Sequence, residues 1–491
     1  MRKILFLFAL ISCQFVNAQS INVTITGSPD SVVKVIYPVN GVDFSWFDNS
    51  KRFTLDANHS VKIPNTMNTA GKIYLVNNGK SQSVFVEPGQ SLQIDVDATG
   101  KDQIVKIQGT NAEGILFSRT LDRPYYQNKS RMYLKKDSSF AGAIKLVDKD
   151  LQKDISKFDS LLALKKISPA YYRQAKRDLT YYYAAVSVSL ITAQYARTTY
   201  KPAHPDYKAT LDKDFENGWE VVFKKYPLTG DLDIAAPDFF DYAKDYVSWY
   251  RLMYLPKKNG TYDQDPFTPE NRFDKYYNGF AANFKGKALE YLQARYIFEE
   301  AMQKQYEPQL VKLYEKFKTT YPESPYNPYI SPLADEIIAY HAKATETFKS
   351  NQTLLASASI NSFEQLIAPF KGKTVYIDMW ATWCSPCKAE FAFNPELKKF
   401  LAAKNVEMLY ISMDGDQADK QWKDMIKFYD LSGNHVRTTT SLRQDLMNKF
   451  WDGKSYAIPR YLIVKNGLIV QDNAKRPGDK DNLYAEISKY L

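Results

Sequence analysis

"KTVYIDMWATWCSPCKAE" (residues 373–390) joins a nearly continuous apolar run to two cysteines three positions apart. The apolar run is typical of a strand that is buried on both faces. Pro386 is typical of the first turn of a helix, where the missing N–H group has no partner to lose. The stretch therefore predicts a buried strand that passes into a helix at Cys384, with Cys387 one turn further along.

A Cys-x-x-Cys pair by itself allows a metal site, a structural disulfide or a redox couple. Apart from Cys13, the chain has no other cysteine. A disulfide that closes so short a loop gains little stability from loop entropy, and a structural zinc site normally needs four ligands. The four histidines have no ligand-like spacing to the pair: His59, His204, His341 and His435. These observations favour a redox couple, with no metal and no cofactor beyond the two thiols.

A redox cysteine attacks as the thiolate. At the start of a helix, the sulfur of Cys384 would face unpaired backbone N–H groups and the positive end of the helix dipole, which lowers the thiol pKa. Cys387 lies deeper in the helix and is expected to be the more buried thiol. The sequence thus predicts that Cys384 attacks and Cys387 resolves, while Lys388 is expected on the solvated face of the helix.

The residues around this motif, 356–491, alternate strands and helices. The stretch 406–414, "VEMLYISMD", is a second buried strand, and 460–471 is a hairpin turned by Asn466-Gly467. Amphipathic helices separate and follow these strands. The pattern predicts an α/β domain with a mixed sheet that is covered on both faces.

Two further regions precede this domain. Residues 19–110 contain short alternating apolar and polar runs separated by Gly and Pro turns, which predict an all-β antiparallel sandwich or barrel. Residues 111–355 have helical periodicity, with Ser168 as a candidate N-cap. Their many tyrosines are expected to pack helices together. The chain is therefore expected to be a multidomain protein with β-rich, α-helical and α/β regions.

The first eighteen residues resemble an export signal. Arg2 and Lys3 precede an apolar run, and "VNA" before Gln19 is a plausible cleavage site. An alternative is lipidation at Cys13 in the lipobox-like "LISC". Either way, we expect export to the periplasm or cell envelope. The formal net charge is +10, but basic residues are mixed with acidic ones, so no nucleic-acid partner is expected.

The C-terminal motifs resemble the thioredoxin superfamily, and more narrowly the exported TlpA/ResA-like thiol–disulfide oxidoreductases. The W-C-x-P-C core and several separated positions match. These are Asp378, Trp380, Ala381, Trp383, Cys384, Pro386, Cys387, Glu390, Ile458 and Pro459. Two departures stand out: Ala392 replaces a proline that these helices usually carry, with Pro395 three places later, and the dipeptide between the cysteines is Ser-Pro. The region 19–110 also resembles, more weakly, a β-rich domain of unknown function that precedes such modules.

The resemblance implies roles for several residues. Asp378 would exchange a proton with Cys387 through water, or would only be an acid satisfied by a neighbouring hydroxyl. Glu390 would tune the thiols or simply face solvent. Trp383, Ile458 and Pro459 would bind substrate, with Pro459 after a cis peptide bond.

The expected function is reversible thiol–disulfide exchange, mainly reduction of disulfides in client proteins, with electrons supplied by a membrane donor of the DsbD type. A disulfide isomerase is the nearest alternative, and a homodimer is possible. A peroxidase is disfavoured because Thr382 lies two, not three, residues before Cys384. In a different class, the chain could be a binding or scaffold protein with an accessory thioredoxin module.

Overall fold

The computed structural model describes residues 19–42, 46, 49–101, 103–228, 230–231, 233–262, 268 and 271–491. The predicted signal segment 1–18, with Cys13, lies outside these residues. The chain forms two compact units: the first extends to Gln293 and includes Ser324–Tyr326, and the second contains Ala294–Glu323 and Asn327–Leu491. Among the described residues, no helix combines the length and the apolar character needed to cross a bilayer.

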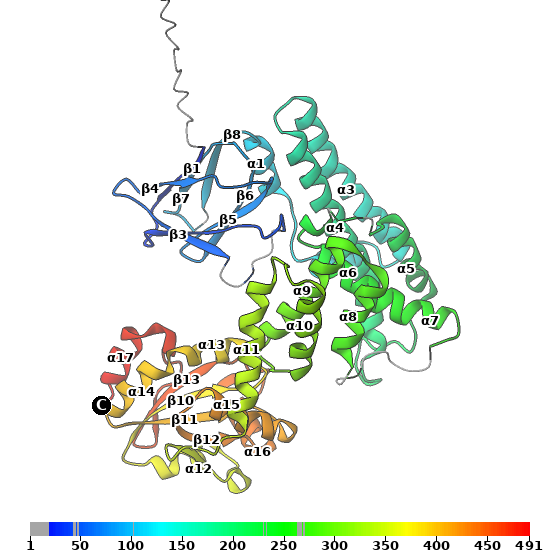
Figure 1. The fold of residues 1–491 in the computed structure, drawn as a ribbon. Helices are drawn as coiled ribbons and strands as arrows, with labels where there is room; N and C mark the ends of the chain where they lie inside the picture. Colours follow the sequence, from blue (N-terminus) through cyan, green and yellow to red (C-terminus); the bar gives the residue numbers. More distant parts are fainter. Residues whose placement is uncertain are drawn as a thin grey trace, which may run out of the picture. The chain divides into compact units, whose positions relative to one another are not determined.

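In the described part of the first unit, the chain begins with eight strands in two four-stranded sheets, ordered β4-β1-β7-β8 and β3-β2-β5-β6 (Figure 1). Side chains alternate between buried and half-buried along β5 and β7, which is the pattern of a strand with one face in a core. The strands are Ser20–Thr26 (β1), Val32–Ile36 (β2), Ser50–Thr54 (β3), Ser60–Pro64 (β4), Gly71–Asn77 (β5), Lys80–Val86 (β6), Leu92–Asp97 (β7) and Ile104–Gly109 (β8).

The β-rich character of this region is confirmed, but the sheets are not purely antiparallel. β1 and β7 pair in parallel, with Val23 opposite Ile94, while the other named strand pairs of these two sheets are antiparallel. The two strands are far apart in the sequence, so local alternation could not indicate their relative direction. Face-to-face packing of the two sheets as a sandwich stays a prediction.

Helices dominate the rest of the first unit, as predicted. Ser168 caps α4 by accepting a hydrogen bond from the N–H of Tyr171 at 3.0 Å. The consecutive tyrosines Tyr181, Tyr182 and Tyr183 are buried, which confirms that tyrosines pack these helices. The helices are Ala112–Thr120 (α1), Tyr126–Lys136 (α2), Phe140–Ala163 (α3), Pro169–Tyr195 (α4), Lys213–Lys225 (α5), Phe239–Asp245 (α6), the π-helical Tyr246–Tyr254, Leu255–Lys258 (α7), Arg272–Asn283 (α8) and Gly286–Met302 (α9), which runs into the second unit.

The second unit contains a six-stranded mixed sheet in the order β14-β13-β10-β11-β12-β9. β10, β11, β12 and β9 pair in parallel, whereas β13 is antiparallel to β10 and β14. The predicted strand at the start of the motif is β10, and its residues from Val375 onward are buried. The strands are Gln352–Leu354 (β9), Thr374–Trp380 (β10), Val406–Ser412 (β11), Gly433–Arg437 (β12), Arg460–Lys465 (β13) and Leu468–Gln471 (β14).

The hairpin between β13 and β14 is confirmed. Asn466 and Gly467 both have positive φ, 52° and 80°, as a two-residue turn of this kind requires.

Helices surround this sheet (Figure 1), and one of them, α11, comes from the region before residue 356. α11 packs against α15 of the α/β region. The helices of the unit after α9 are Pro308–Thr320 (α10), Asn327–Ala344 (α11), Phe363–Ile367 (α12), Ser385–Glu390 (α13), Asn394–Ala403 (α14), Asp419–Phe428 (α15), Thr440–Trp451 (α16) and Asp481–Ser488 (α17).

Candidate redox site

Cys384 and Cys387 form a disulfide at the point where β10 passes into α13. Cys384 is the N-cap of α13, with extended backbone, and its Sγ accepts a hydrogen bond from the N–H of Cys387 at 3.2 Å. Cys387 is fully buried, and Cys384 is 3% exposed. The predicted placement is therefore confirmed: one sulfur lies at the positive end of a helix, and the other lies inside it.

The turn before Cys384 is held by a residue that sequence reasoning missed. Asp414 accepts hydrogen bonds from the backbone N–H and the hydroxyl of Thr382, at 2.9 Å and 2.8 Å. The N–H of Cys384 in turn donates to the carbonyl of Ala381 at 3.0 Å. Asp414 follows β11, which runs parallel to β10. The carboxyl ends of both strands therefore lie at the same edge of the sheet. An acid directly after the second buried strand was the available signal.

Asp378 lies in the middle of β10, opposite Tyr410 on β11 and Tyr461 on β13. It is 1% exposed, and neither carboxyl oxygen has a hydrogen-bond partner within the described part of the chain. Burial, reinforced by the charge of Glu390, raises the pKa of Asp378 well above its usual value. Among the residues that the structure describes, no hydroxyl donates to this carboxyl group, so the alternative of an acid satisfied by a neighbouring hydroxyl finds no support there.

Glu390 does not face solvent. It is buried, and its Oε2 accepts a hydrogen bond from the N–H of Gly478 at 2.7 Å. Its Oε1 lies 3.6 Å from Nη1 of Arg476. A Cβ at position 478 would lie 3.0 Å from Oε2, so glycine allows this close approach. Glu390 therefore joins the end of α13 to the segment after β14, within electrostatic range of Asp378.

The predicted substrate-binding residues occupy a more open part of the site. The indole of Trp383 is 53% exposed, and its ring centroid lies 6.3 Å from that of Tyr456. Ile458 and Pro459 are half-buried, and the peptide bond between them is cis, as the resemblance implies. Tyr456 also lies 5.9 Å from Trp451, ring centroid to centroid. An exposed tryptophan thus lies next to Cys384, and its ring neighbours the half-buried Tyr456.

Lys388 contradicts its expected exposure. The residue is 2% exposed, and its ammonium donates to three carbonyl oxygens: Thr382 at 2.8 Å, and Gln303 and Lys304 at 2.9 Å each. The helical pattern of α13 could not reveal this burial, because Gln303 and Lys304 belong to a loop more than 80 residues earlier in the chain.

The helix after the cysteines is interrupted, in line with the missing proline at Ala392. α13 ends at Glu390, a 3₁₀ turn covers Phe391–Phe393, and α14 starts at Asn394 with Pro395 in its first turn. Pro395 therefore begins a new helix, a position where its missing N–H leaves no carbonyl unpaired.

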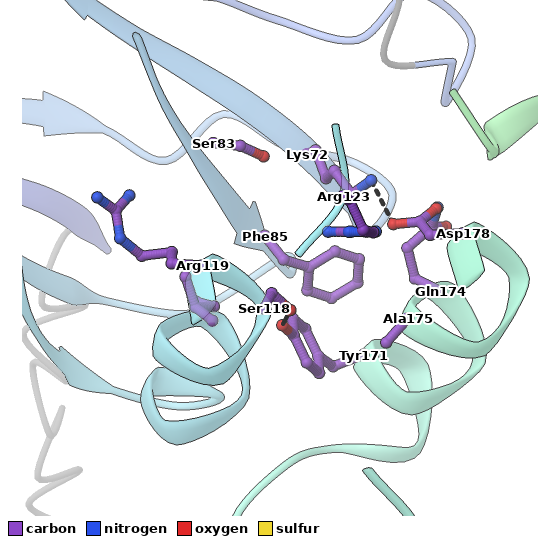
Figure 2. A pocket seen from close by; sticks show the side chains of 11 residues that line it. Lys72, Ser83, Phe85, Ser118, Arg119, Arg123, Tyr171, Gln174, Ala175 and Asp178 are labelled. Carbon is purple, nitrogen blue, oxygen red and sulfur yellow. Dashed lines mark hydrogen bonds and ion pairs between the residues drawn. The ribbon is translucent and has the colours of Figure 1, made fainter. Parts of the chain in front are cut away.

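A separate cavity of about 200 Å³ lies in the first unit, between β5, β6, α1 and α4 (Figure 2). Lys72 and Asp178 form an ion pair at one side, and the hydroxyl oxygens of Ser118 and Tyr171 are 2.8 Å apart. Arg119 and Arg123 add positive charge to the lining. The cavity contains no cysteine, so it adds nothing to thiol chemistry. Among the described residues, no group of three or more His, Cys, Asp or Glu side chains is arranged to hold a metal ion.

Comparison with known proteins agrees with this geometry. Residues 343–487 match the family model described as Redoxin. The thiol-disulfide oxidoreductase ResA of Bacillus thuringiensis subsp. konkukian (strain 97-27) is 42% identical over 62 residues, which are 13% of this chain and 35% of that protein. ResA of Geobacillus kaustophilus (strain HTA426) is 25% identical over 113 residues, 23% of this chain and 60% of that protein. The chain thus spans about a third of the length of the Bacillus relative.

Among solved structures, the thioredoxin domain of a thiol-disulfide oxidoreductase from Bacteroides vulgatus is 26% identical. The match covers 26% of this chain and 84% of that chain, with a TM-score of 0.21.

Proposed function

We propose that the protein is a thiol–disulfide oxidoreductase that reduces disulfides in client proteins, on the premise that residues 343–487, which match the Redoxin model and are similar to ResA, form a TlpA/ResA-like module. The observation that carries the proposal is the position of Cys384. Its sulfur caps a helix and accepts the N–H of Cys387, beside an exposed tryptophan. This environment favours the thiolate, which is the attacking species.

The exchange is a two-electron cycle. The Cys384 thiolate attacks one sulfur of a client disulfide, the client S–S bond breaks, and the other client sulfur leaves as a thiolate that takes up a proton. Cys387 then loses its proton and attacks Sγ of Cys384, which releases the second client thiolate. The client ends as a dithiol and the protein as the Cys384–Cys387 disulfide.

In this cycle, Asp378 is the proposed proton acceptor for Cys387. The carboxyl group is buried without a hydrogen-bond partner among the described residues, and burial raises its pKa well above the usual value, which makes its ionised form a stronger base. A water would carry the proton between the carboxyl group and the thiol. Glu390 supports this role by adding negative charge that further raises the pKa of Asp378.

A dithiol donor must return two electrons to the Cys384–Cys387 disulfide, and we assign this role to a membrane protein of the DsbD type. The assignment goes with export, which the basic and apolar character of residues 1–18 supports. Fractionation of cells, together with the mass of the purified N-terminus, tests export and distinguishes cleavage after Ala18 from lipidation at Cys13. Recovery of the full-length chain from the cytoplasm would contradict it.

A trapping experiment tests the function. Cys387→Ser leaves Cys384 able to attack but removes the thiol that resolves the mixed disulfide. Cells that express this variant are expected to accumulate mixed disulfides with client proteins, whereas cells with Cys384→Ser are not. Purified wild-type protein should reduce a model protein disulfide, and both variants should lose turnover. Unchanged turnover in Cys384→Ser would overturn the proposal, and an unchanged cellular phenotype in both variants would favour a binding protein.

The direction of exchange needs its own measurement. Refolding of a scrambled multi-disulfide protein separates the two candidates: a reductase needs a continuous supply of dithiol, whereas an isomerase works with a catalytic amount. We expect activity to stop when the dithiol is exhausted.

A further inference from the structure

Lys388, the residue after the second cysteine, is a buried cation whose hydrogen bonds within the described part of the chain all go to backbone carbonyls. Its three N–H donors are each used by a backbone carbonyl, of Thr382, Gln303 and Lys304. A protonated amine has three donors and no acceptor, so this set saturates it. The charge on the amine strengthens each hydrogen bond.

The three carbonyls come from two segments that the sequence does not place together. Thr382 is two residues before Cys384, whereas Gln303 and Lys304 lie in the loop between α9 and α10. Lys304 has a φ of 52°, a left-handed conformation that is uncommon for a residue other than glycine. With this backbone conformation, the consecutive carbonyls of Gln303 and Lys304 both accept hydrogen bonds from the Lys388 ammonium.

The loop is itself anchored to the α/β region. The hydroxyl of Tyr306 pairs with that of Tyr429 and lies 3.1 Å from Oε1 of Glu336, and Nε2 of His341 lies 2.8 Å from the Tyr306 carbonyl oxygen. The amide of Gln305 reaches toward the Thr382 carbonyl at 3.5 Å. We call residues Gln303–Tyr306 the anchor loop.

Burial lowers the pKa of Lys388 to about 8, with the neighbouring Lys304 charge acting in the same direction. At pH 7 the ammonium is still the main form. The charges of Asp414 and Glu336 act in the opposite direction, and three carbonyl acceptors suit a charged amine. The site therefore keeps a positive charge, hydrogen-bonded to the turn that leads into Cys384.

We propose that Lys388 is a positioning residue for the attack by Cys384: its ammonium ties the Thr382 turn to the anchor loop and holds a positive charge beside the redox helix. This proposal rests on the proposed exchange function, but it concerns the Cys384 thiol itself. The reactivity of that thiol then depends on α9 and α10, which precede the α/β region in the sequence.

Two consequences distinguish this role from simple packing. Without the ammonium, the Thr382 carbonyl loses its main donor and the turn before Cys384 is less restrained. Without the charge, the turn at Thr382, two residues before Cys384, loses a buried cation. Both effects raise the thiol pKa, and one unit of increase lowers the thiolate fraction near neutral pH about tenfold.

The test uses the full chain in the Cys387→Ser background, so that Cys384 is the single thiol of the motif. Lys388→Met keeps the length of the side chain but removes its charge and donors, and Lys399→Met on the exposed face of α14 is the control. Alkylation of Cys384 by iodoacetamide is followed from pH 5 to 10. We expect the midpoint of the Lys388→Met profile to rise by about one unit, with a rate at pH 7 about tenfold lower, and Lys399→Met to match the parent.

A second variant keeps the inference testable if Lys388→Met does not fold. Tyr306→Phe removes the hydroxyl that pairs with Tyr429, so it loosens the anchor loop without touching the lysine. It is expected to shift the profile in the same direction, and the double variant is expected to shift less than the sum of the two.

Folded Lys388→Met with the parent's midpoint would show a merely structural lysine and overturn the proposal, even if its melting temperature fell. If Lys388→Met does not fold, an unchanged midpoint in Tyr306→Phe would overturn it. These readouts need no client. A protein that shows the expected shifts but reduces no disulfide would therefore refute the proposed function and leave this inference intact.

Discussion

The backbone N–H of Cys387 points at Sγ of Cys384 over 3.2 Å, so the second cysteine of the motif donates to the sulfur of the first. A donor at this position at the start of a helix stabilises negative charge on that sulfur. In the reduced protein, Cys384 should therefore titrate below the value of about 8.5 for a free thiol. Alkylation followed against pH should give a lower midpoint for Cys387→Ser, which retains Cys384, than for Cys384→Ser. Equal midpoints would remove the chemical asymmetry between the two cysteines.

We predict that replacing Asp378 raises the stability of the protein and lowers its activity. The pKa of this carboxyl group is raised in the folded state, so above the pKa of the unfolded chain, about 3.9, folding must either take up a proton or bury a charge. Asp378→Asn keeps the shape without that proton uptake, so urea unfolding should show a more stable protein. The gain should grow as pH rises, because the stability of the wild type falls as pH passes through the raised pKa.

Disulfide reduction by Asp378→Asn should fall by about 100-fold, the lower range for loss of a general acid–base group. Asp481→Asn, at an exposed position of α17, is the control. A variant that is both stable and fully active would show that the carboxyl group takes no part in proton exchange.

Glu390 supplies an acceptor and a charge, and two variants separate them. Glu390→Gln keeps an oxygen for the N–H of Gly478, whereas Glu390→Ala removes it. We expect Glu390→Ala to lose about 1–2 kcal/mol of unfolding free energy and Glu390→Gln to lose less. Both should lower the pKa of Asp378, because its second cause is the charge of Glu390. Equal stability loss in the two variants would contradict the role of the Gly478 contact.

His435 gives the second unit a defined acid sensitivity. The ring stacks on Tyr410 with centroids 4.9 Å apart, its Nε2 pairs with the Leu431 carbonyl at 3.0 Å, and Nδ1 has no hydrogen-bond partner among the described residues. Burial lowers the pKa of His435 to about 4. The unfolded chain therefore binds the proton more readily, and stability should fall as pH drops from about 6.5 to 4.

The lost contribution of His435 is about 3 kcal/mol across this range. Urea unfolding at several pH values, compared with His435→Gln, isolates it from the carboxylates that titrate in the same range. The difference between the two proteins should change steadily between pH 6.5 and 4. A constant difference would mean that this ring is not held neutral.

We predict that Trp383 contributes to the binding of client proteins and little to the stability of the fold. Its side chain is 53% exposed, so Trp383→Ala should change the unfolding free energy by less than about 0.5 kcal/mol. An exposed indole next to Cys384 offers apolar contact to an approaching polypeptide. The KM for a protein disulfide should rise several-fold, while reduction of a small disulfide should be nearly unchanged. A parallel loss with both substrates would instead place the indole in the exchange step.

The motif residues show which parts of the site could be predicted from the sequence. Cys384, Cys387 and Pro386 lie next to one another in the chain, so the change from apolar run to helix predicted their placement. The Asn466-Gly467 hairpin was also predictable, because the turn depends on the φ preferences of its own two residues.

Other parts of the site were not predictable in this way. Lys388 reads as a surface lysine on a short helix, yet it binds carbonyls 84 and 85 residues earlier in the chain. Glu390 similarly binds an N–H 88 residues later. The parallel direction of β1 and β7 likewise depends on pairing between distant segments.

The sequence by itself determined the redox pair, its place at the start of a helix and the α/β pattern around it, because these depend on near neighbours in the chain. Only the tertiary structure decided which polar groups are buried and what they contact. Burial and hydrogen-bond partners are set by segments that meet in space, and no local pattern records where Gln303, Asp414 or Gly478 will lie once the chain has folded.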